Sequence, residues 1–170
     1  MAFDLQLEQA KYLQGIHDVK ALPVVAQNAL EAGYDSRSLR MLAGMEKPTN
    51  WDAEPLWFRA LDELGATHLT KSDALEPVVD WVIAEWTTGN YQLRVAASIL
   101  QRLCAENDYD IRLTAIYTMA EYVQIGVADE KDLIEQFQRF RLRDFDQHFF
   151  AGPIRQTWWR RARRRLGLGH

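Results

Sequence analysis

The stretch that decides the fold class is residues 22–33, Leu22-Pro23-Val24-Val25-Ala26-Gln27-Asn28-Ala29-Leu30-Glu31-Ala32-Gly33. Its apolar side chains at 22, 25, 26, 29 and 30 follow the i, i+3, i+4, i+7, i+8 spacing of one helix stripe. Pro23 suits the first turn of such a helix, and Gly33 suits its end, where a residue with positive φ is favoured. The spacing therefore predicts an amphipathic α-helix that buries one side.

Helical spacing of apolar residues recurs along the chain, and no segment shows the sustained alternation of a β-strand. Further helices are predicted over residues 3–14, 36–43, 52–64, 71–88, 91–105, 109–124 and 130–145. Glycines expected to end helices at positive φ are Gly15, Gly33, Gly44, Gly65, Gly89 and Gly126. The pattern predicts an all-α fold of about eight short helices packed as antiparallel pairs, in an orthogonal bundle or a HEAT-like arrangement.

Polar residues mark where two of these helices begin. Either Asp35 or Ser36 is expected to cap the helix over 36–43. In the segment 71–88, either Asp73 caps a helix with Glu76 three residues later, or a short turn precedes a kink at Pro77. Both alternatives are compatible with the apolar spacing.

The composition is that of an ordinary globular domain, with 170 residues of which 48% are apolar and 26% charged. It excludes a disordered polymer, a collagen-like fibre and a disulfide scaffold. Cys104 is the single cysteine and can form no internal disulfide. Neither a signal peptide nor a transmembrane segment is predicted, and a reducing, cytoplasmic compartment is expected.

The net charge of −4 conceals a strong asymmetry. Residues 151–170 carry six arginines and no acidic residue, whereas the other 150 residues carry 14 basic and 24 acidic groups. The sequence thus predicts an acidic helical body over residues 1–150 and a basic segment, rich in arginine and tryptophan, over residues 151–170. A body with this acidic excess is poorly suited to binding nucleic acid directly.

The basic segment has the pattern of an amphipathic helix, because Ile154, Trp158, Ala162 and Leu166 fall four residues apart. Two interpretations are open. Either it packs on the body as the last helix, or it is a functional arm for an anionic membrane surface, nucleic-acid phosphates or an acidic protein. As an arm, its binding residues are Arg155, Trp158, Trp159, Arg160, Arg161, Arg163, Arg164 and Arg165.

Asp144, Asp146 and His148 form the densest group of metal-ligating residue types. Alternate residues converge on one side only of an extended backbone, and there two carboxylates and an imidazole can hold a divalent ion. The alternative is a set of charges at a helix end with no function. The pair His17-Asp18 lacks the further ligands of a metal-dependent phosphohydrolase, and we expect it in a solvent-facing turn.

No standard catalytic motif and no cofactor-binding motif stands in the sequence, so enzyme activity is the less favoured hypothesis and no cofactor is predicted. Tryptophan, in contrast, occurs six times, and this residue type is enriched at the energetic centres of protein interfaces. Most of the six are expected in the core or half-buried. Trp51 is expected to be exposed because it precedes its helix, and it is the candidate interface residue.

Residues 29–44, ALEAGYDSRSLRMLAG, resemble a segment of small all-α bacterial proteins to which no function is assigned. The shared pattern is A-L-x-x-G-x-D-S-x-x-L-R-x-L-A-G, and a looser likeness continues from Glu54 to Leu64. The resemblance implies a bacterial, cytosolic helical protein. It transfers no catalytic residue, because capping and packing residues carry it.

Three functions follow from these observations. The favoured one is a non-enzymatic bacterial protein-binding module, an adaptor or an immunity-type inhibitor, that acts through an acidic helical surface. The first alternative is binding of nucleic acid or an anionic membrane surface through the basic segment. The second alternative is a metal-dependent enzyme that uses Asp144, Asp146 and His148.

Overall fold

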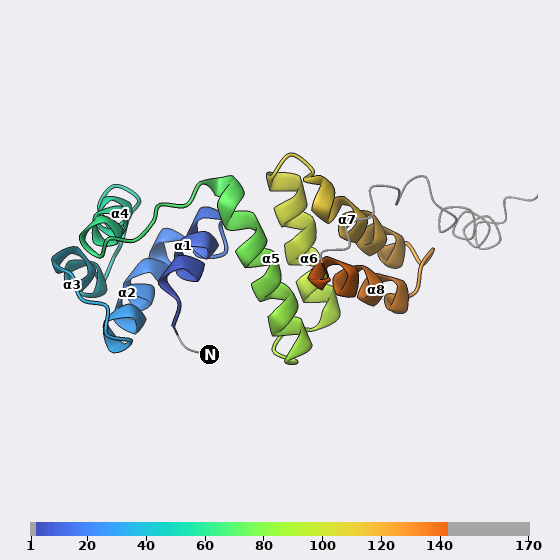
Figure 1. Ribbon diagram of the computed structural model, residues 1–170, viewed down its shortest axis with the longest axis horizontal. Helices are drawn as coiled ribbons and strands as arrows, with labels where there is room; N and C mark the ends of the chain where they lie inside the picture. Colours follow the sequence, from blue (N-terminus) through green and yellow to red (C-terminus); the bar gives the residue numbers. More distant parts are fainter. Residues whose placement is uncertain (1–2, 143–170) are drawn as a thin grey trace, which may run out of the picture. The chain divides into compact units, whose positions relative to one another are not determined.

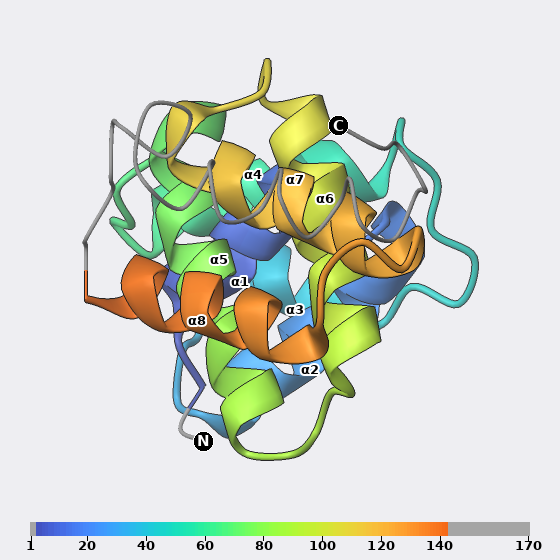
Figure 2. The same cartoon turned by 90° about the vertical axis from the view of Figure 1, so that its right-hand side faces the viewer.

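A computed structural model describes residues 3–142 of the chain. These residues form eight α-helices, one short 3-10 helix and no β-strand, so the predicted all-α class is confirmed. The chain divides after Val78 into two compact units, which we call unit 1 (described over 3–78) and unit 2 (described over 79–142). Figure 1 and Figure 2 label their helices. The predicted boundary at residue 150 lies outside the described residues.

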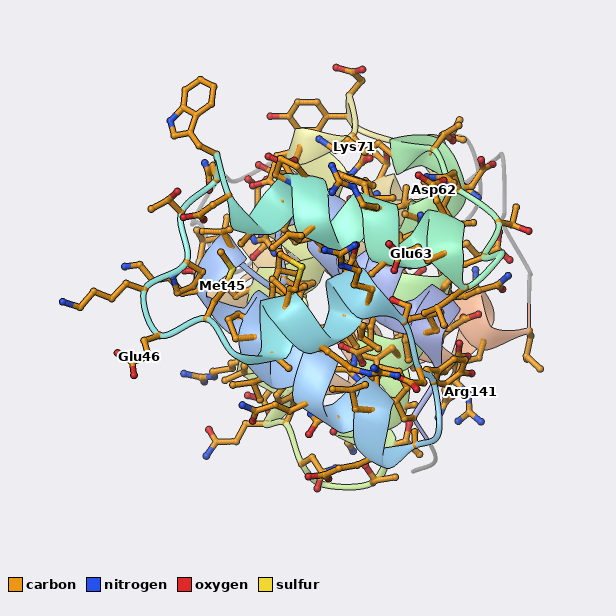
Figure 3. The ribbon with its side chains drawn as sticks, turned by 90° about the vertical axis from the view of Figure 1, so that its left-hand side faces the viewer. Met45, Glu46, Asp62, Glu63, Lys71 and Arg141 are labelled. Atoms are coloured by element: carbon orange, nitrogen blue, oxygen red, sulfur yellow. The ribbon has the colours of Figure 1, made fainter. Side chains whose placement is uncertain are left out.

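Unit 1 is built from four α-helices, a 3-10 helix and the start of a fifth α-helix. These elements are α1 (Leu5–Leu13), η1 (Val19–Ala21), α2 (Leu22–Glu31), α3 (Arg37–Ala43), α4 (Ala53–Glu63) and α5 (Lys71–Thr87). The contacts are mainly between neighbours in the sequence: α2 packs against α3, and α3 packs against α4 (Figure 3). Helix α5 continues past Val78 into unit 2.

The helix predicted over residues 22–33 is α2, and the core covers its predicted stripe. Leu22, Ala26 and Ala29 are fully buried and Val25 is 5% exposed. Helices α3 and α4 add Leu39, Leu42, Ala53, Trp57, Ala60 and Leu61 to the same cluster. The core of unit 1 therefore follows the helical period of the apolar residues.

Hydrogen bonds from polar side chains fix the start of α3. Ser36 is its N-cap, because the Ser36 hydroxyl accepts a hydrogen bond from the backbone N–H three residues later at 3.1 Å. Asp35, the other predicted cap, pairs with Arg40 instead. Glu63, which points from the end of α4 toward α3 (Figure 3), accepts hydrogen bonds from the Ser38 N–H and hydroxyl at 2.9 and 2.8 Å. These bonds, the backbone one foremost, hold the pKa of Glu63 below its ordinary value.

The residue that caps α5 differs from the one expected. The Thr70 hydroxyl accepts the Asp73 N–H at 3.1 Å, and the Asp73 carboxylate accepts the Thr70 N–H at 3.2 Å. This reciprocal pair is a capping box in which Asp73 occupies the third helical position, so the prediction that Asp73 is the cap was wrong. Thr70 is the N-cap because its hydroxyl accepts the backbone N–H of the third helical residue, Asp73. The helix then begins at Lys71 and includes Pro77.

Unit 2 contains the rest of α5 together with α6 (Leu93–Glu106), α7 (Ile111–Gln124) and α8 (Glu130–Arg141). Helix α6 packs against α7, and α7 against α8 (Figure 2). Helices α6 and α7 each begin two residues later than predicted, and α8 ends at Arg141 rather than at residue 145. At α7 the reason is that the Asp110 carboxylate accepts the Arg112 N–H at 2.9 Å and so takes the cap position.

Some of the turns that follow the helices have a glycine at positive φ, and others do not. Within the described part of the chain, the glycines with positive φ are Gly15, Gly33, Gly65, Gly89 and Gly126, as predicted. Gly44 was also predicted to have a positive φ, but its φ is −86°, so the chain leaves α3 without a left-handed turn. Between α6 and α7, Asp108 and Tyr109 adopt φ of 53° and 54°. A residue with a side chain is strained by about 1–2 kcal/mol in this conformation, so this turn stores strain.

We expect Asp108→Gly to raise the free energy of unfolding by roughly 0.5 kcal/mol, because glycine relieves the strain at some cost in chain entropy. Gly33→Ala is the opposite case, since its φ is +94° and an added Cβ would meet no atom within 4 Å. The Gly33→Ala substitution should lower the free energy of unfolding by about 1 kcal/mol through backbone strain alone. Urea unfolding followed by circular dichroism measures both, and an Asp108→Gly variant less stable than the wild type would contradict the strained turn.

Helix α1 buries polar side chains that apolar spacing does not predict. Gln9 and Gln14 are each 1% exposed. The Gln9 amide, in the orientation that satisfies both of its ends, donates to the Thr67 carbonyl at 3.0 Å and accepts from the Leu69 N–H at 3.2 Å. Gln14 donates to the Lys71 carbonyl at 2.6 Å. Helix α1 therefore holds the segment between α4 and α5 through buried hydrogen bonds.

Helix α1 also carries Glu8, which pairs with two basic side chains. The Glu8 carboxylate accepts a hydrogen bond from Lys11 Nζ at 2.8 Å and lies 2.8 Å from His17 Nε2. Burial alone would raise the pKa of Glu8, but the hydrogen bonds with His17 and Lys11 outweigh it, and the pKa lies below its ordinary value. The ionised carboxylate thus stabilises the folded state.

Glu8→Gln should lower the free energy of unfolding at pH 7 by roughly 2 kcal/mol, because buried hydrogen bonds to a charged group are lost. Since the pKa of Glu8 is lowered on folding, its contribution is complete above its unfolded value and is lost as the pH falls. The difference between variant and wild type should therefore shrink below about pH 4 in urea titrations. The exposed Glu31→Gln is the control, and equal losses in the two variants would contradict a special role for Glu8.

Candidate functional site

Trp51 is the most exposed of the large apolar side chains that the structure describes, with 93% of its surface accessible. Trp57, six residues further along the chain, is fully buried. Trp81 and Trp86 in unit 2 are half-buried. The expectation that Trp51 stands outside the core is therefore met, whereas its role at an interface remains a prediction.

Trp51 stands at the tip of a hydrogen-bonded turn. The Asp52 carboxylate accepts the Thr49 N–H at 2.6 Å, and the Thr49 carbonyl accepts the N–H groups of Asp52 and Ala53 at 3.3 and 2.9 Å. The hydrogen bond from the Thr49 backbone holds the pKa of Asp52 below its ordinary range. Because residues on both sides of Trp51 are bonded to each other, the backbone that carries the indole is preorganised.

The turn is fastened to unit 1 at both ends. Met45, which precedes it, packs against the core cluster, and Ala53, which follows it, is fully buried. Between these two points Glu46 extends away from the helices (Figure 3). The indole of Trp51 therefore projects from a fixed base. We call residues 45–52 the Trp51 turn.

The chain around the Trp51 turn is acidic. Residues 45–69 carry five acidic groups and two basic ones, which are Glu46, Asp52, Glu54, Asp62 and Glu63 against Lys47 and Arg59. The described residues as a whole carry 22 acidic and 13 basic groups. A surface with this excess attracts cationic partners over distances of about 8 Å at physiological ionic strength.

The other predicted site residues lie outside the described residues. This applies to the metal-ligand candidates Asp144, Asp146 and His148 and to the whole basic segment over 151–170. The metal site and the polyanion-binding arm therefore stay predictions from the sequence.

Within residues 3–142, no three His, Cys, Asp or Glu side chains come together as metal ligands could. His17 faces Glu8, while Asp18 accepts hydrogen bonds from the Lys20 and Ala21 N–H groups at 3.0 and 3.2 Å. The two side chains of this pair thus have separate structural partners. Asp18 acts as the N-cap of η1.

Cys104 is fully buried on α6, and burial raises the pKa of its thiol to about 11. The thiol is therefore protonated at neutral pH and serves as a packing group. Among the described helices, none combines the length and the apolar character that crossing a bilayer requires.

Two exposed apolar residues, one in the α6–α7 turn and one at the start of α7, were not predicted from the sequence. Tyr109 is 57% exposed and Ile111 is 75% exposed. Tyr109 packs edge-on against Tyr117 with ring centroids 5.5 Å apart. The signal that could have found this turn is the sequence Asp108-Tyr109 at a place where the other left-handed turns of the chain have glycine.

We expect Trp51→Ala to change the free energy of unfolding by less than about 0.5 kcal/mol, because an exposed side chain contributes little to the folded state. Trp57→Ala should lower it by about 3–5 kcal/mol, because it removes a fully buried indole. Urea unfolding of the two variants measures the contrast. A comparable loss in Trp51→Ala would show that the indole packs on unit 1.

The chain matches no protein-family model, no curated protein and no solved structure.

Proposed function

We propose that this chain is a protein-binding module that acts by contact rather than by chemistry, with the Trp51 turn as its anchor. The observation that carries the proposal is an indole with 93% of its surface accessible on a turn whose backbone is fixed by hydrogen bonds. An adaptor and an immunity-type inhibitor, whose acidic surface covers the basic active site of a toxin, are the two forms considered.

The energy available from one such side chain is large. Covering an indole removes roughly 150–250 Å² from water, which at about 25 cal/mol per Å² corresponds to roughly 4–6 kcal/mol. Tryptophan is enriched among the few residues that dominate interface energies, and a preorganised one loses little entropy on binding. A partner with an apolar pocket for the indole would gain most of this energy.

The charge around the turn indicates what surrounds that pocket. Since residues 45–69 have five acidic and two basic groups, the complementary surface is basic. Charge of this kind mainly speeds association and weakens with salt, whereas the buried indole governs dissociation. The partner is thus expected to be a protein with an apolar pocket inside a basic rim.

The proposal is tested by capturing partners of the tagged chain in its host cells and purifying the protein that is retained. The purified partner is then titrated calorimetrically with the wild type, Trp51→Ala and Met41→Ala. Loss of the indole should weaken binding by about 30-fold or more. Met41 is the matched control, because it is also apolar and 51% exposed on unit 1. Equal affinity of the wild type and Trp51→Ala would contradict the proposal.

A further inference from the structure

Helix α7 of unit 2 carries a second stripe of apolar and small side chains besides the one in the core. The stripe follows the i, i+4, i+7, i+11, i+14 spacing and consists of Ile111, Ala115, Thr118, Tyr122 and Ile125. At about 100° per residue it lies opposite the buried Leu113, Ile116 and Ala120. Its two ends are open to solvent, because Ile111 is 75% and Ile125 is 67% exposed, and the three residues between them are half-buried. We call these five residues the α7 stripe.

An apolar outward side sets α7 apart from the helix that follows it. Helix α7 has two charged residues among its 14, whereas α8 has six among its 12. The exposed residues within α8 are all polar: Glu130, Lys131, Glu135, Gln138 and Arg141. Helices α6 and α8 pack against α7, and a helix that is apolar on two sides is normally covered on both. The α7 stripe is therefore a candidate docking surface for a further element.

The charge around α7 indicates which kind of element fits. Residues 106–130, which comprise α7 and the turns at both of its ends, carry six acidic groups and one basic group. They are Glu106, Asp108, Asp110, Glu121, Asp129 and Glu130 against Arg112. A second copy of α7 would bring two acidic surfaces together, whereas a basic element would be attracted.

The chain itself contains a basic element of matching length. The segment over residues 151–170, which lies outside the described residues, has six arginines and no acidic residue. If it is helical, its apolar residues from Ile154 to Leu166 extend over about 18 Å. The α7 stripe extends over about 21 Å from Ile111 to Ile125. The two stripes therefore agree in length and are opposite in charge.

The basic segment starts within reach of α7. The described chain ends at Leu142, directly after α8. Helices α7 and α8 are joined by a short turn and pack together, so they run antiparallel and the end of α8 lies toward the start of α7. Residues 143–153 can extend over as much as about 36 Å, which exceeds the length of α7. The segment can thus reach either end of the stripe.

We infer that residues 154–166 dock as a helix on the α7 stripe. The apolar side chains of the two stripes pack together, and the arginines lie among the acidic groups around α7. Of the two interpretations that the sequence leaves open, this one makes the basic segment the last helix of unit 2 rather than a free arm. The inference is independent of the proposed function, because the Trp51 turn belongs to unit 1.

The test uses ¹⁹F NMR of the full chain labelled with 5-fluorotryptophan and compares spectra in H₂O and D₂O. Trp51, 93% exposed, and Trp57, fully buried, are internal standards for complete and zero solvent contact. Trp158 should show less than about half of the isotope shift of Trp51, because the docked stripe covers its ring. Trp159 lies about 100° further round such a helix and should show a larger shift than Trp158.

Variants of α7 identify the docking surface. Ile111→Ser combined with Ile125→Ser should lower the docking equilibrium constant about a hundredfold, because two apolar contacts are lost. The isotope shift of Trp158 should then approach that of Trp51. The matched control is Val24→Ser combined with Met41→Ser, since these residues are 56% and 51% exposed on unit 1, and it should leave Trp158 unchanged. Circular dichroism checks that both double variants are folded.

Four outcomes would overturn the inference. A Trp158 as exposed as Trp51 in the wild type would show a free arm, available to a polyanion or a membrane surface. Shielding that survives the loss of both isoleucines would place the segment on another surface. Shielding that increases with protein concentration would show that a second copy of the chain provides the contact. An equal effect of the control variant would show that the change is not specific to α7.

Discussion

The burial of Trp57 is the constraint on which the candidate site depends. This indole is fully enclosed in the core of unit 1, and its position fixes the rotation of α4 about its own axis. A helix has 3.6 residues per turn, so once Trp57 and Leu61 point inward, Arg59 and Asp62 fall on the exposed side. The Trp57 Nε1 group has no hydrogen-bond partner among the described residues. The volume of the ring, rather than its polar atom, therefore holds it in place.

Hydrogen bonds made by polar side chains complete the frame around this helix. Glu63 ties the end of α4 to the start of α3, and Gln9 holds the loop that contains His68. The same helix α1 contributes Tyr12, whose ring packs edge-on against Phe58 with centroids 6.2 Å apart. Hydrogen bonds from polar side chains of α1 and α4 thus fix neighbouring segments of unit 1 relative to each other.

Apolar periodicity was sufficient to predict the all-α class and the stripe of α2, and the position of Trp51 before its helix predicted that it is exposed. It did not predict the features that depend on polar side chains. The choice of Ser36 over Asp35 as a cap depends on which side chain reaches a free N–H, and the cap at Thr70 depends on a reciprocal hydrogen bond with Asp73. Gln9 and Gln14 are buried because they hydrogen-bond to backbone groups far along the chain, and no local pattern encodes such contacts. The contact between the rings of Tyr12 and Phe58 was not predicted for the same reason, since the two residues are 46 positions apart.

The most direct measurement is ¹⁹F NMR of the full chain labelled with 5-fluorotryptophan, with resonances assigned by single Trp→Phe substitutions. The change in chemical shift between H₂O and D₂O reports contact of each indole with solvent. The resonance of Trp51 should show the full solvent isotope shift and that of Trp57 none. A shielded Trp51, or equal shifts for the two residues, would contradict the exposed anchor on which the proposed function depends.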